Sequence, residues 1–443
     1  MNIINMLPSF KIKNKRTSNQ QPATSNQQPA TEASFEEILN DLSALRPELT
    51  PDFIKTILLN QSLYLQLNGD VKDSKLCPVY HYYTFGSKEG REFCSPDFRL
   101  IKKQLLETGT KKIIFFDVSK DNASFLYRGF FLELRNDDVQ IIHQETELIM
   151  AIKSIFSANE MIFIRPSFNS KKTKYFINLC KILNIKISMN FDDLLLPEYV
   201  SEQGAVRSRV FDASSHQGSL INNSAMLLNT EELILSSKKL GEIFSGFIDN
   251  IYIKNNRLPL EYFLPREEIC KKITKEINGK INLFYLSGSK THLKDYSLIS
   301  GCLIKLAMEY PDKFCINFMG KLNNQVPIFL NLGVETKFIP FASFEEMIRE
   351  IGRNDLVLVP LENTVFNNVK SNIKFIEAAS QGVPVIASSV DEYKLAIESG
   401  VNGWLCEDEY QWYDTLKSII LLKKNIRQVG LAAYDTALRS YSI

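Results

Sequence analysis

The segment that most constrains the fold of this chain spans residues 355–405. Apolar runs occupy residues 356–360 and 383–387. Between them lie a polar loop and a helical pattern over residues 371–381, which Gly382 ends. Short apolar runs on either side of a helix are typical of buried, parallel strands. The segment therefore predicts a strand–loop–helix–strand unit, in which ligands bind at the carboxyl ends of the strands.

The loop and the first helical turn of this unit carry cationic and hydroxyl side chains. They hold Lys370, Ser371 and Lys374, and Glu377 follows one turn later. Lysine and serine side chains at a helix N-terminus suit a phosphate or a diphosphate. A carboxylate just behind them suits the hydroxyl groups of a sugar, as the ribose-binding acid does in dinucleotide folds.

The residue order K-S-x-x-K-F-I-E-A-A-x-x-G-V-P-V-I-A-S, followed later by G-x-x-G-W-L, resembles the C-terminal domain of group-1 glycosyltransferases. These are family-4-like, retaining, metal-independent enzymes of the GT-B fold. The resemblance implies that Glu377 binds the ribose of a nucleotide sugar and that Ser371 also binds this donor. It further implies that Lys370 and Lys374 neutralise the diphosphate as catalytic residues. Many members carry a second glutamate where this chain has Val369. Members with a lysine–serine pair also lack it, so we interpret Val369 as a subfamily trait that leaves the donor sugar open.

The composition bounds the class of protein. A chain of 443 residues is too long for one hydrophobic core and predicts two or three domains. Its 52 basic and 51 acidic residues leave a net charge of +1, so nucleic acid is not an expected partner. Seven cysteines without C-x-x-C spacing predict reduced thiols in a cytoplasmic protein, and neither disulfides nor a zinc site. We expect no transmembrane helix and no signal peptide.

Residues 1–34 are predicted to be a disordered tail. The sequence TSNQQPA occurs twice in succession over residues 17–30, and a polar, proline-bearing repeat buries too little apolar surface to fold. The basic residues 1–16 also fit a weak amphipathic segment on a membrane surface, which would place the protein at the inner face of the membrane. The alternative is an unstructured start without a function.

Residues 35–105 are predicted to form a small, mainly helical accessory module. They contain Y-L-x-x-N-x-D-V, P-x-x-H-Y-x-x-x-G-x-x-E-G-R and S-P-x-F, which resemble a module attached to polysaccharide-building glycosyltransferases. His81 and Arg91 belong to these motifs. One interpretation is structural, with a buried histidine and a capping arginine, and the other is a ligand site; a resemblance in fold does not decide between them.

Residues 110–265 are predicted to form a Rossmann-like domain with a parallel, doubly wound sheet, because apolar strand patterns alternate with helical patterns. The strand patterns cover residues 111–118, 160–168, 186–195, 224–230 and 250–256. The domain resembles the acceptor-side domain of the same glycosyltransferases.

Polar residues follow these strands, where such sheets place their sites. The candidates for the acceptor side of the cleft are Arg128, Arg165, Asp192 and Asp193. The adjacent Asp192 and Asp193 can equally belong to a loop or cap a helix. We do not expect them to bind a metal, because no residue separates them and no third hard ligand is evident.

Residues 270–425 are predicted to form the donor domain, and residues 426–443 a C-terminal helix. The resemblance to GT-B proteins implies that this helix crosses back over the first domain. A strand over residues 281–286 leads into Ser287, Gly288 and Ser289, and His292 follows at a helix start. Small residues let backbone N–H groups approach a phosphate. The phrase resembles the family segment Y-x-S-G-[ST]-x-T-H-x-x-D. This implies that the small residues bind the donor and that His292 is catalytic; a core or capping histidine is the alternative.

Together these features predict an α/β protein of the GT-B fold. Two Rossmann-like, doubly wound domains face a cleft and are preceded by the helical module and the tail. The resemblance implies transfer of a sugar from a nucleotide diphosphate sugar to a glycan or lipid-linked acceptor in surface polysaccharide biosynthesis. It implies retention of configuration and no metal or other cofactor. The alternatives are a degenerate transferase that acts as a non-catalytic scaffold and a nucleotide-sugar epimerase of the same fold.

Overall fold

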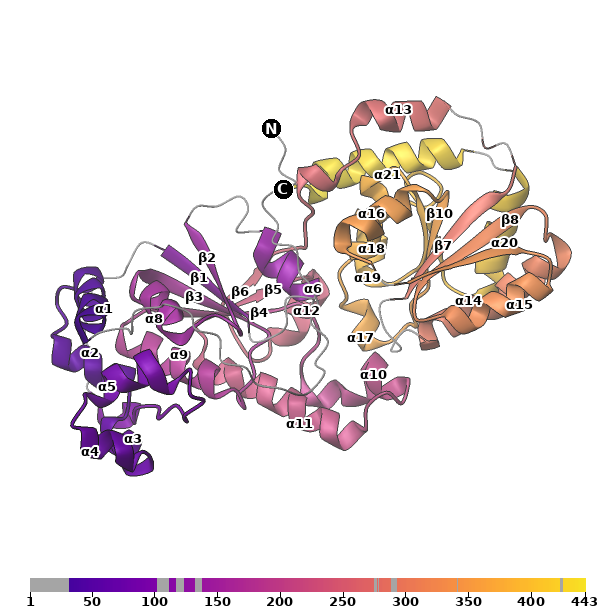
Figure 1. Cartoon of the computed structure of the whole chain (residues 1–443). Coiled ribbons are helices and arrows are strands. Elements are labelled where there is room, and N and C mark those ends of the chain that lie inside the picture. The colour runs from indigo at the N-terminus through magenta and orange to yellow at the C-terminus, as the bar shows by residue number, and fades with distance from the viewer. Residues whose placement is uncertain are drawn as a thin grey trace, which may run out of the picture.

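The computed structural model describes residues 32–101, 111–116, 123–131, 138–274, 277, 279–287, 293–340, 342–422 and 425–443. Two α/β domains stand side by side, and a small helical module lies on the first, on the side away from the second (Figure 1). The predicted tail lies outside the described residues up to residue 31, and helix α1 begins at Glu32. Within the described ranges, no helix is long and apolar enough to cross a membrane.

The first domain is built on a six-stranded parallel sheet in the order β2-β1-β3-β4-β5-β6. Its strands are β1 (Lys111–Phe116), β2 (Val139–His143), β3 (Ala158–Ile164), β4 (Lys186–Phe191), β5 (Glu232–Leu235) and β6 (Ile251–Ile253). Its helices include α6 (Ala123–Phe125), α8 (Leu148–Phe156), α9 (Lys171–Ile182), α10 (Gly204–Arg207), α11 (Ala213–Ser224) and α12 (Lys238–Phe244). The predicted doubly wound α/β architecture is confirmed for this domain.

One predicted strand of this sheet is wrong. Residues 224–230 contain the 3-10 helix η6 (Ala225–Asn229), which continues from the end of α11, and the strand β5 follows directly after it. Within η6 only Met226 is buried, whereas β5 buries Leu233, Ile234 and Leu235. Burial on the pleated sheet, and not apolar content alone, decides which run becomes the strand.

The accessory module is helical, as predicted. It contains α1 (Glu32–Leu45), α2 (Pro51–Leu58), α3 (Gln61–Leu67), α4 (Gly69–Ser74) and α5 (Pro78–His81). The hydroxyl of Tyr64 lies 3.0 Å from Nδ1 of the buried His81. Arg91 donates to both carboxylate oxygens of Asp70, at 2.8 and 2.7 Å, and to Asn68 at 3.0 Å. Both motif residues therefore hold the module together, which favours their structural interpretation.

The module is fixed to the first domain by hydrogen bonds and by a common core. Arg46 donates to the carbonyl oxygens of Phe156 (2.7 Å) and Ala158 (3.0 Å), where α8 ends and β3 begins. The hydroxyl of Tyr175 on α9 donates to the carbonyl of Ile57 at 3.0 Å. Apolar residues of the module and of the first domain belong to one buried cluster. Because this core is continuous, we expect the module and the first domain to move as one body.

The second domain has a six-stranded parallel sheet in the order β9-β8-β7-β10-β11-β12. Its strands are β7 (Ile281–Ser287), β8 (Phe314–Gly320), β9 (Glu335–Ile339), β10 (Leu356–Val359), β11 (Val385–Ser388) and β12 (Trp404–Cys406). Its helices are α13 (Arg266–Thr274), α14 (Leu293–Glu309), α15 (Val326–Asn331), α16 (Phe344–Gly352), α17 (Val365–Asn368), α18 (Ile373–Ser380), α19 (Asp391–Ala396), α20 (Glu409–Leu422) and α21 (Ile426–Tyr441). Counted from β7, the strand order is that of dinucleotide-binding Rossmann domains.

The strand–loop–helix–strand unit predicted from residues 355–405 is confirmed. In it, β10 and β11 pair in parallel, and Leu358 lies between Tyr285 of β7 and Ile386 of β11. Helix α18 lies between the two strands and ends at Ser380, and Gly382 follows two residues later with a φ of +64°, which suits glycine because it has no Cβ. The buried parallel pairing places the loop before α18 at the carboxyl edge of the sheet.

The last helix takes a different place from the predicted one. Helix α21 packs against α13 and α18 of its own domain, and Figure 1 shows it along the edge of the second domain. The end of the chain after α21 pairs with the segment that links the domains. The backbone N–H of Leu258 donates to the carbonyl of Tyr441, and the backbone N–H of Ile443 donates to the carbonyl of Leu258. Tyr441 accepts a hydrogen bond from Asn372, just before α18. The apolar face of α21 is thus buried on the second domain, and the prediction that it crosses back over the first is corrected.

Candidate active site

Each sheet has one point at which the strand order reverses, and these two points face each other across the domains. The strand order reverses between β1 and β3 in the first sheet and between β7 and β10 in the second, and α/β sheets bind ligands at the carboxyl ends beside such points. A cavity of about 700 Å³ lies there, between the domains. Its polar lining residues are Ser124, Tyr127, Arg165, Asp192, Asp193, Asn256, Ser343, Lys370, Ser371, Lys374, Glu377 and Tyr393.

The wall on the second domain is cationic. Lys370 and Ser371 precede α18, and Lys374 lies in its first turn. The ammonium group of Lys374 donates to the carbonyl of Leu286, at the end of β7, at 3.1 Å. That of Lys370 lies 4.7 Å from the ring centroid of Phe366. Burial lowers the pKa of Lys374, because a dry environment disfavours the charged form. The predicted phosphate-binding residues are therefore gathered on one wall.

Glu377 lies behind these cations and contacts the first domain. The hydroxyl of Tyr127, from the segment after β1, donates to its Oε1 at 2.6 Å. Burial raises the pKa of Glu377 to about 7, although the hydrogen bond from Tyr127 and the charge of Lys374 oppose the increase. Glu377 is 5% exposed, so it faces the cavity from a largely dry position.

The opposite wall combines one cation with two acids. Arg165, at the end of β3, donates to Asp193 at 2.8 Å and to Ser124 at 3.1 Å, and its Nε lies 3.5 Å from Asp192. Ser124 in turn donates to Asp192. Asp192 and Asp193 together raise the pKa of Arg165, although its burial acts in the opposite direction. The structure thus brings three of the four predicted acceptor-side residues to the cavity.

The fourth candidate, Arg128, lies beneath this wall and is not among the residues that line the cavity. It is 2% exposed, and it donates to Asn190 at 2.9 Å and to Asn256 at 3.0 Å. Asn256 then donates to Ser371 of the second domain at 2.9 Å. Arg128 therefore helps to position the linker between the domains, and Asn256 of this linker bonds Ser371 on the wall that the second domain forms.

The predicted donor phrase after β7 is described only in part. Ser287 ends β7 and is buried, whereas Gly288, Ser289 and His292 lie outside the described residues. Asp295 of the same phrase is buried and accepts hydrogen bonds from the backbone of Glu362 and the side chain of Asn367. This acid therefore fixes the loop that follows β10.

Val369 has a packing role. It is 0% exposed and belongs, with Phe366, to the apolar cluster of the first domain. Its carbonyl accepts a hydrogen bond from Ser237 of that domain at 2.6 Å. An acid at this position would have to be buried in an apolar interface, which is costly for a carboxylate. The apolar side chain of Val369 therefore suits this contact between the domains.

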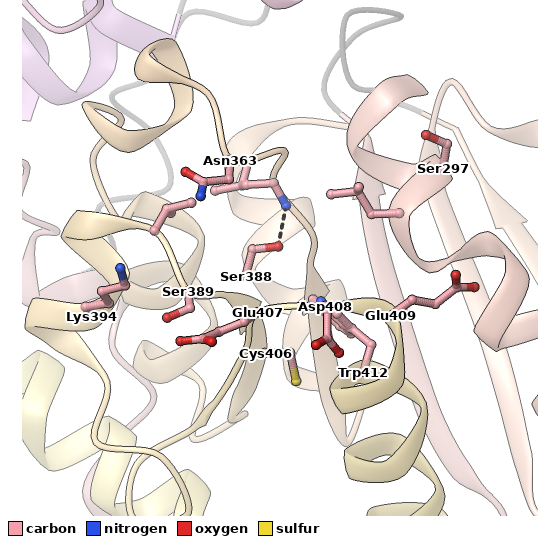
Figure 2. Close-up of a pocket in the computed structure, with 13 residues that line it drawn as sticks. Ser297, Asn363, Ser388, Ser389, Lys394, Cys406, Glu407, Asp408, Glu409 and Trp412 are labelled. Atoms are coloured by element: carbon pink, nitrogen blue, oxygen red, sulfur yellow. Dashed lines mark hydrogen bonds between the residues drawn. The ribbon is translucent and has the colours of Figure 1, made fainter.

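A second cavity, of about 630 Å³, lies on the second domain beyond the carboxyl ends of β11 and β12. Figure 2 shows Glu407, Asp408 and Glu409 around it, with the Glu407 side chain reaching toward Ser389 and Lys394. Three carboxylates against one lysine repel a diphosphate. The interdomain cavity is therefore the better candidate for the predicted ligand.

Sequence reasoning missed the roles of two residues at the site, Tyr127 and Asn256. Both contact the second domain through side-chain hydrogen bonds, to Glu377 and Ser371 respectively. The one signal in the sequence was their position after a strand, in the same place as the predicted candidates. Among the described residues, no group of three or more histidine, cysteine or acidic side chains is arranged to hold a metal ion.

Two Rossmann-like domains that face a cavity with a cationic wall define a protein of the GT-B fold, as predicted. Residues 307–421 match the family described as glycosyl transferases group 1. This match lies within the second domain and includes the whole segment from Lys370 to Glu377.

The chain is also similar to curated relatives and to solved structures. The chain is 23% identical over 206 residues to the D-inositol 3-phosphate glycosyltransferases of Mycobacterium sp. strains JLS and KMS, a match that covers 44% of this chain and 44% of each relative. Sucrose-phosphate synthase from Thermosynechococcus elongatus is similar in structure, with a TM-score of 0.53 and 13% identity over 75% of this chain and 95% of that one. Anabaena Alr3699/HepE in complex with UDP and glucose has a TM-score of 0.51 and 15% identity over 75% and 96%. At these identities the structures show the fold.

Proposed function

We propose that this protein is a glycosyltransferase that moves a sugar from a nucleotide diphosphate sugar to an acceptor hydroxyl. The observation that carries the proposal is the grouping of Lys370, Ser371, Lys374 and Glu377 on one wall of the interdomain cavity, within the stretch that matches the group 1 family. The complex of the similar Anabaena protein with UDP and glucose supports the choice of donor.

The proposed chemistry depends on stabilising the leaving group. As the bond from the sugar C1 to the diphosphate breaks, negative charge builds up on the diphosphate. Lys370 and Lys374 are held in place at the cavity by Phe366 and by the Leu286 carbonyl. Cations fixed in advance stabilise developing charge without reorganising during the reaction. A diphosphate bound there also favours the protonated form of Lys374, whose pKa is lowered by burial.

We propose that the transfer needs no metal and retains the configuration at the anomeric carbon. The lysines supply the positive charge that a divalent cation brings in other transferases. The two carboxylates of the opposite wall, Asp192 and Asp193, are both paired with Arg165. This pairing supports a mechanism without a carboxylate nucleophile, in contrast to retaining glycosidases.

The proposed acceptor is a glycan or a lipid-linked glycan of a surface polysaccharide, at the cytoplasmic face of the membrane. The support is the resemblance of residues 35–105 to a module of polysaccharide-building enzymes. The wall of Arg165, Asp192 and Asp193 offers both donors and acceptors to sugar hydroxyls. A peripheral membrane contact through residues 1–16 belongs to the same proposal.

The test is a thermal-shift screen with UDP, GDP, dTDP, CDP and their common sugars in the presence of EDTA. A ligand that binds only the folded state raises the melting temperature, so we expect one nucleotide to give a clear shift without metal. Lys374→Met should remove most of that shift. Lys394→Met is the matched control, because Lys394 lies in the second cavity, and it should keep the shift.

The same screen separates the alternatives. If no nucleotide shifts the melting temperature, with or without magnesium, the scaffold interpretation replaces the transferase. If a nucleotide sugar binds and is converted to its epimer without an acceptor, the protein is an epimerase. Incubation with the identified donor, followed by separation of the sugar products, distinguishes these outcomes.

A further inference from the structure

The second cavity lies beyond the carboxyl ends of β11 and β12 and is separate from the interdomain cavity. It is enclosed by the loop after β10, by the segments that follow β11 and β12, and by the helices α14 and α20 (Figure 2). Of the described residues, Leu361 alone lines both cavities. Because parallel α/β sheets bind ligands beyond the carboxyl ends of their strands, the second cavity is a candidate site of its own.

Trp412 brings a hydrogen-bond donor without a partner to this cavity. The residue lies on α20, is 2% exposed, and belongs to the apolar cluster between the sheet and α14. Its indole N–H makes no hydrogen bond to a described residue, and protein atoms do not seal it off. Buried tryptophans usually find a partner for this group. Since Trp412 lines the second cavity, its N–H can donate to a ligand there.

The other polar groups of the cavity are mainly acceptors. The exposed side chains of Glu407, Asp408 and Glu409 follow β12. In Figure 2 the Glu407 side chain lies beside Ser389, and the Glu409 side chain lies on the side of α14. Asp408 accepts the backbone N–H of Gln411 with Oδ1, at 2.8 Å. The cavity thus offers carboxylate oxygens on several sides and the indole N–H from α20.

This combination of groups selects one class of ligand. Three carboxylates against the single Lys394 repel an anion. A metal ion or an alkylammonium ion binds carboxylate oxygens but cannot accept a hydrogen bond from Trp412. A hydroxyl group both donates and accepts. A compound with several hydroxyl groups therefore satisfies the acids and the indole N–H together, and saccharides are such compounds.

We propose that the second cavity is a saccharide-binding site. The indole N–H of Trp412 donates to one sugar hydroxyl, and the carboxylates of Glu407 and Asp408 accept from others. Lys394 is half-exposed and lies 3.9 Å from Asp391 outside the cavity lining, so it leaves these carboxylates to the ligand. The site takes a neutral saccharide and excludes one that carries phosphate or sulfate. It does not depend on the donor assignment of the interdomain cavity.

The test is saturation-transfer NMR of the full chain with maltotriose, mannotriose, lactose and diacetylchitobiose. We expect at least one of them to bind the wild type. Trp412→Phe keeps an aromatic ring in the core but removes the N–H, and Glu407→Ala removes an exposed acceptor. A neutral hydrogen bond contributes about 0.5–1.5 kcal/mol, so each variant should raise the Kd of that saccharide by about twofold to tenfold. No binding by any of the saccharides, or a Kd that both variants leave unchanged, would overturn the proposal.

The matched control is Trp404→Phe, the same substitution at the other tryptophan of the chain, which does not line the cavity. It should leave the Kd unchanged, and it makes Trp412 the sole tryptophan, whose fluorescence should then change when the saccharide is added. Asp193→Asn, in the interdomain cavity, should also leave the Kd unchanged. Loss of binding in Asp193→Asn would place the saccharide in that cavity and overturn the proposal. Binding of spermidine without binding of any saccharide would overturn it as well, because the cavity would then select cations.

Discussion

Replacing Glu377 with glutamine should stabilise the protein while it weakens nucleotide binding. Glutamine has nearly the same shape, and its carbonyl oxygen can still accept the hydrogen bond from Tyr127. What the substitution removes is a negative charge in a position that is 5% exposed. The two consequences have opposite signs, because the charge is costly to bury in the folded protein and, in the proposed function, holds the ribose hydroxyls.

The magnitude follows from the pKa of the carboxyl group. Burial raises it to about 7 in the folded protein, from an ordinary value of 4.5. Between these values the folded protein binds more protons than the unfolded chain, so the free energy of unfolding falls as the pH rises. At about 1.4 kcal/mol for each pH unit, the ionised group costs the folded state about 3 kcal/mol above pH 7. Below about pH 4.5 the group is protonated in both states, and this cost is absent.

The assay is the melting temperature of the wild type and of Glu377→Gln at about pH 5 and about pH 8, without ligand. The variant should melt several degrees higher than the wild type at the upper pH, and most of that difference should disappear at the lower pH. Comparing the two proteins at each pH cancels the titration of all other groups. A melting difference that is the same at both pH values would refute the reasoning, because it would show that the carboxyl group is not buried in its ionised form.

Three further results are expected. Lys374→Met should lower turnover at saturating donor by about a hundredfold or more, since one fixed cation of the leaving group is lost; turnover near the wild-type level would contradict the diphosphate assignment. Gly86→Ala should lower the free energy of unfolding by about 1–3 kcal/mol in urea titrations, because a Cβ there meets the Tyr64 hydroxyl; an unchanged midpoint would argue against the close packing of the module. Arg207→Ala removes an ion pair with Glu362 across the domains, whose side chains are 34% and 19% exposed, and it should lower the free energy of unfolding by less than about 1 kcal/mol; a larger loss would contradict a minor role for this pair.

The donor wall could be predicted from the sequence because its parts are neighbours in the chain. Lys370, Ser371, Lys374 and Glu377 lie within one loop and two turns of helix, and the flanking strands β10 and β11 are continuous apolar runs. The spacing of the apolar residues and the residues that start and end a helix therefore predict where these four side chains lie, without knowledge of the rest of the fold. Most of the opposite wall was also predicted, because Arg165, Asp192 and Asp193 directly follow strands.

What could not be predicted depends on contacts between distant parts of the chain. Tyr127 and Glu377 are 250 residues apart, and no local pattern indicates that their side chains meet. Val369 was interpreted as a subfamily trait, and only the packing of the two domains shows that its side chain is buried between them. Strands β2 and β12 were also missed, since V-Q-I-I-H and W-L-C are short and their burial comes from the layers around them.

Because the accessory module and the first domain share a core, two native cysteines can be used to measure the distance between the two halves of the molecule. Cys270, on α13 of the second domain, is exposed, and Cys77, in the module, is partly exposed, whereas the other five thiols are buried. Dyes or spin labels attached to the unmodified protein should therefore go to these two positions first. Because we expect the module and the first domain to move as one body on their shared core, a change in the distance between the two labels when the donor is added should report a movement of the second domain relative to the first.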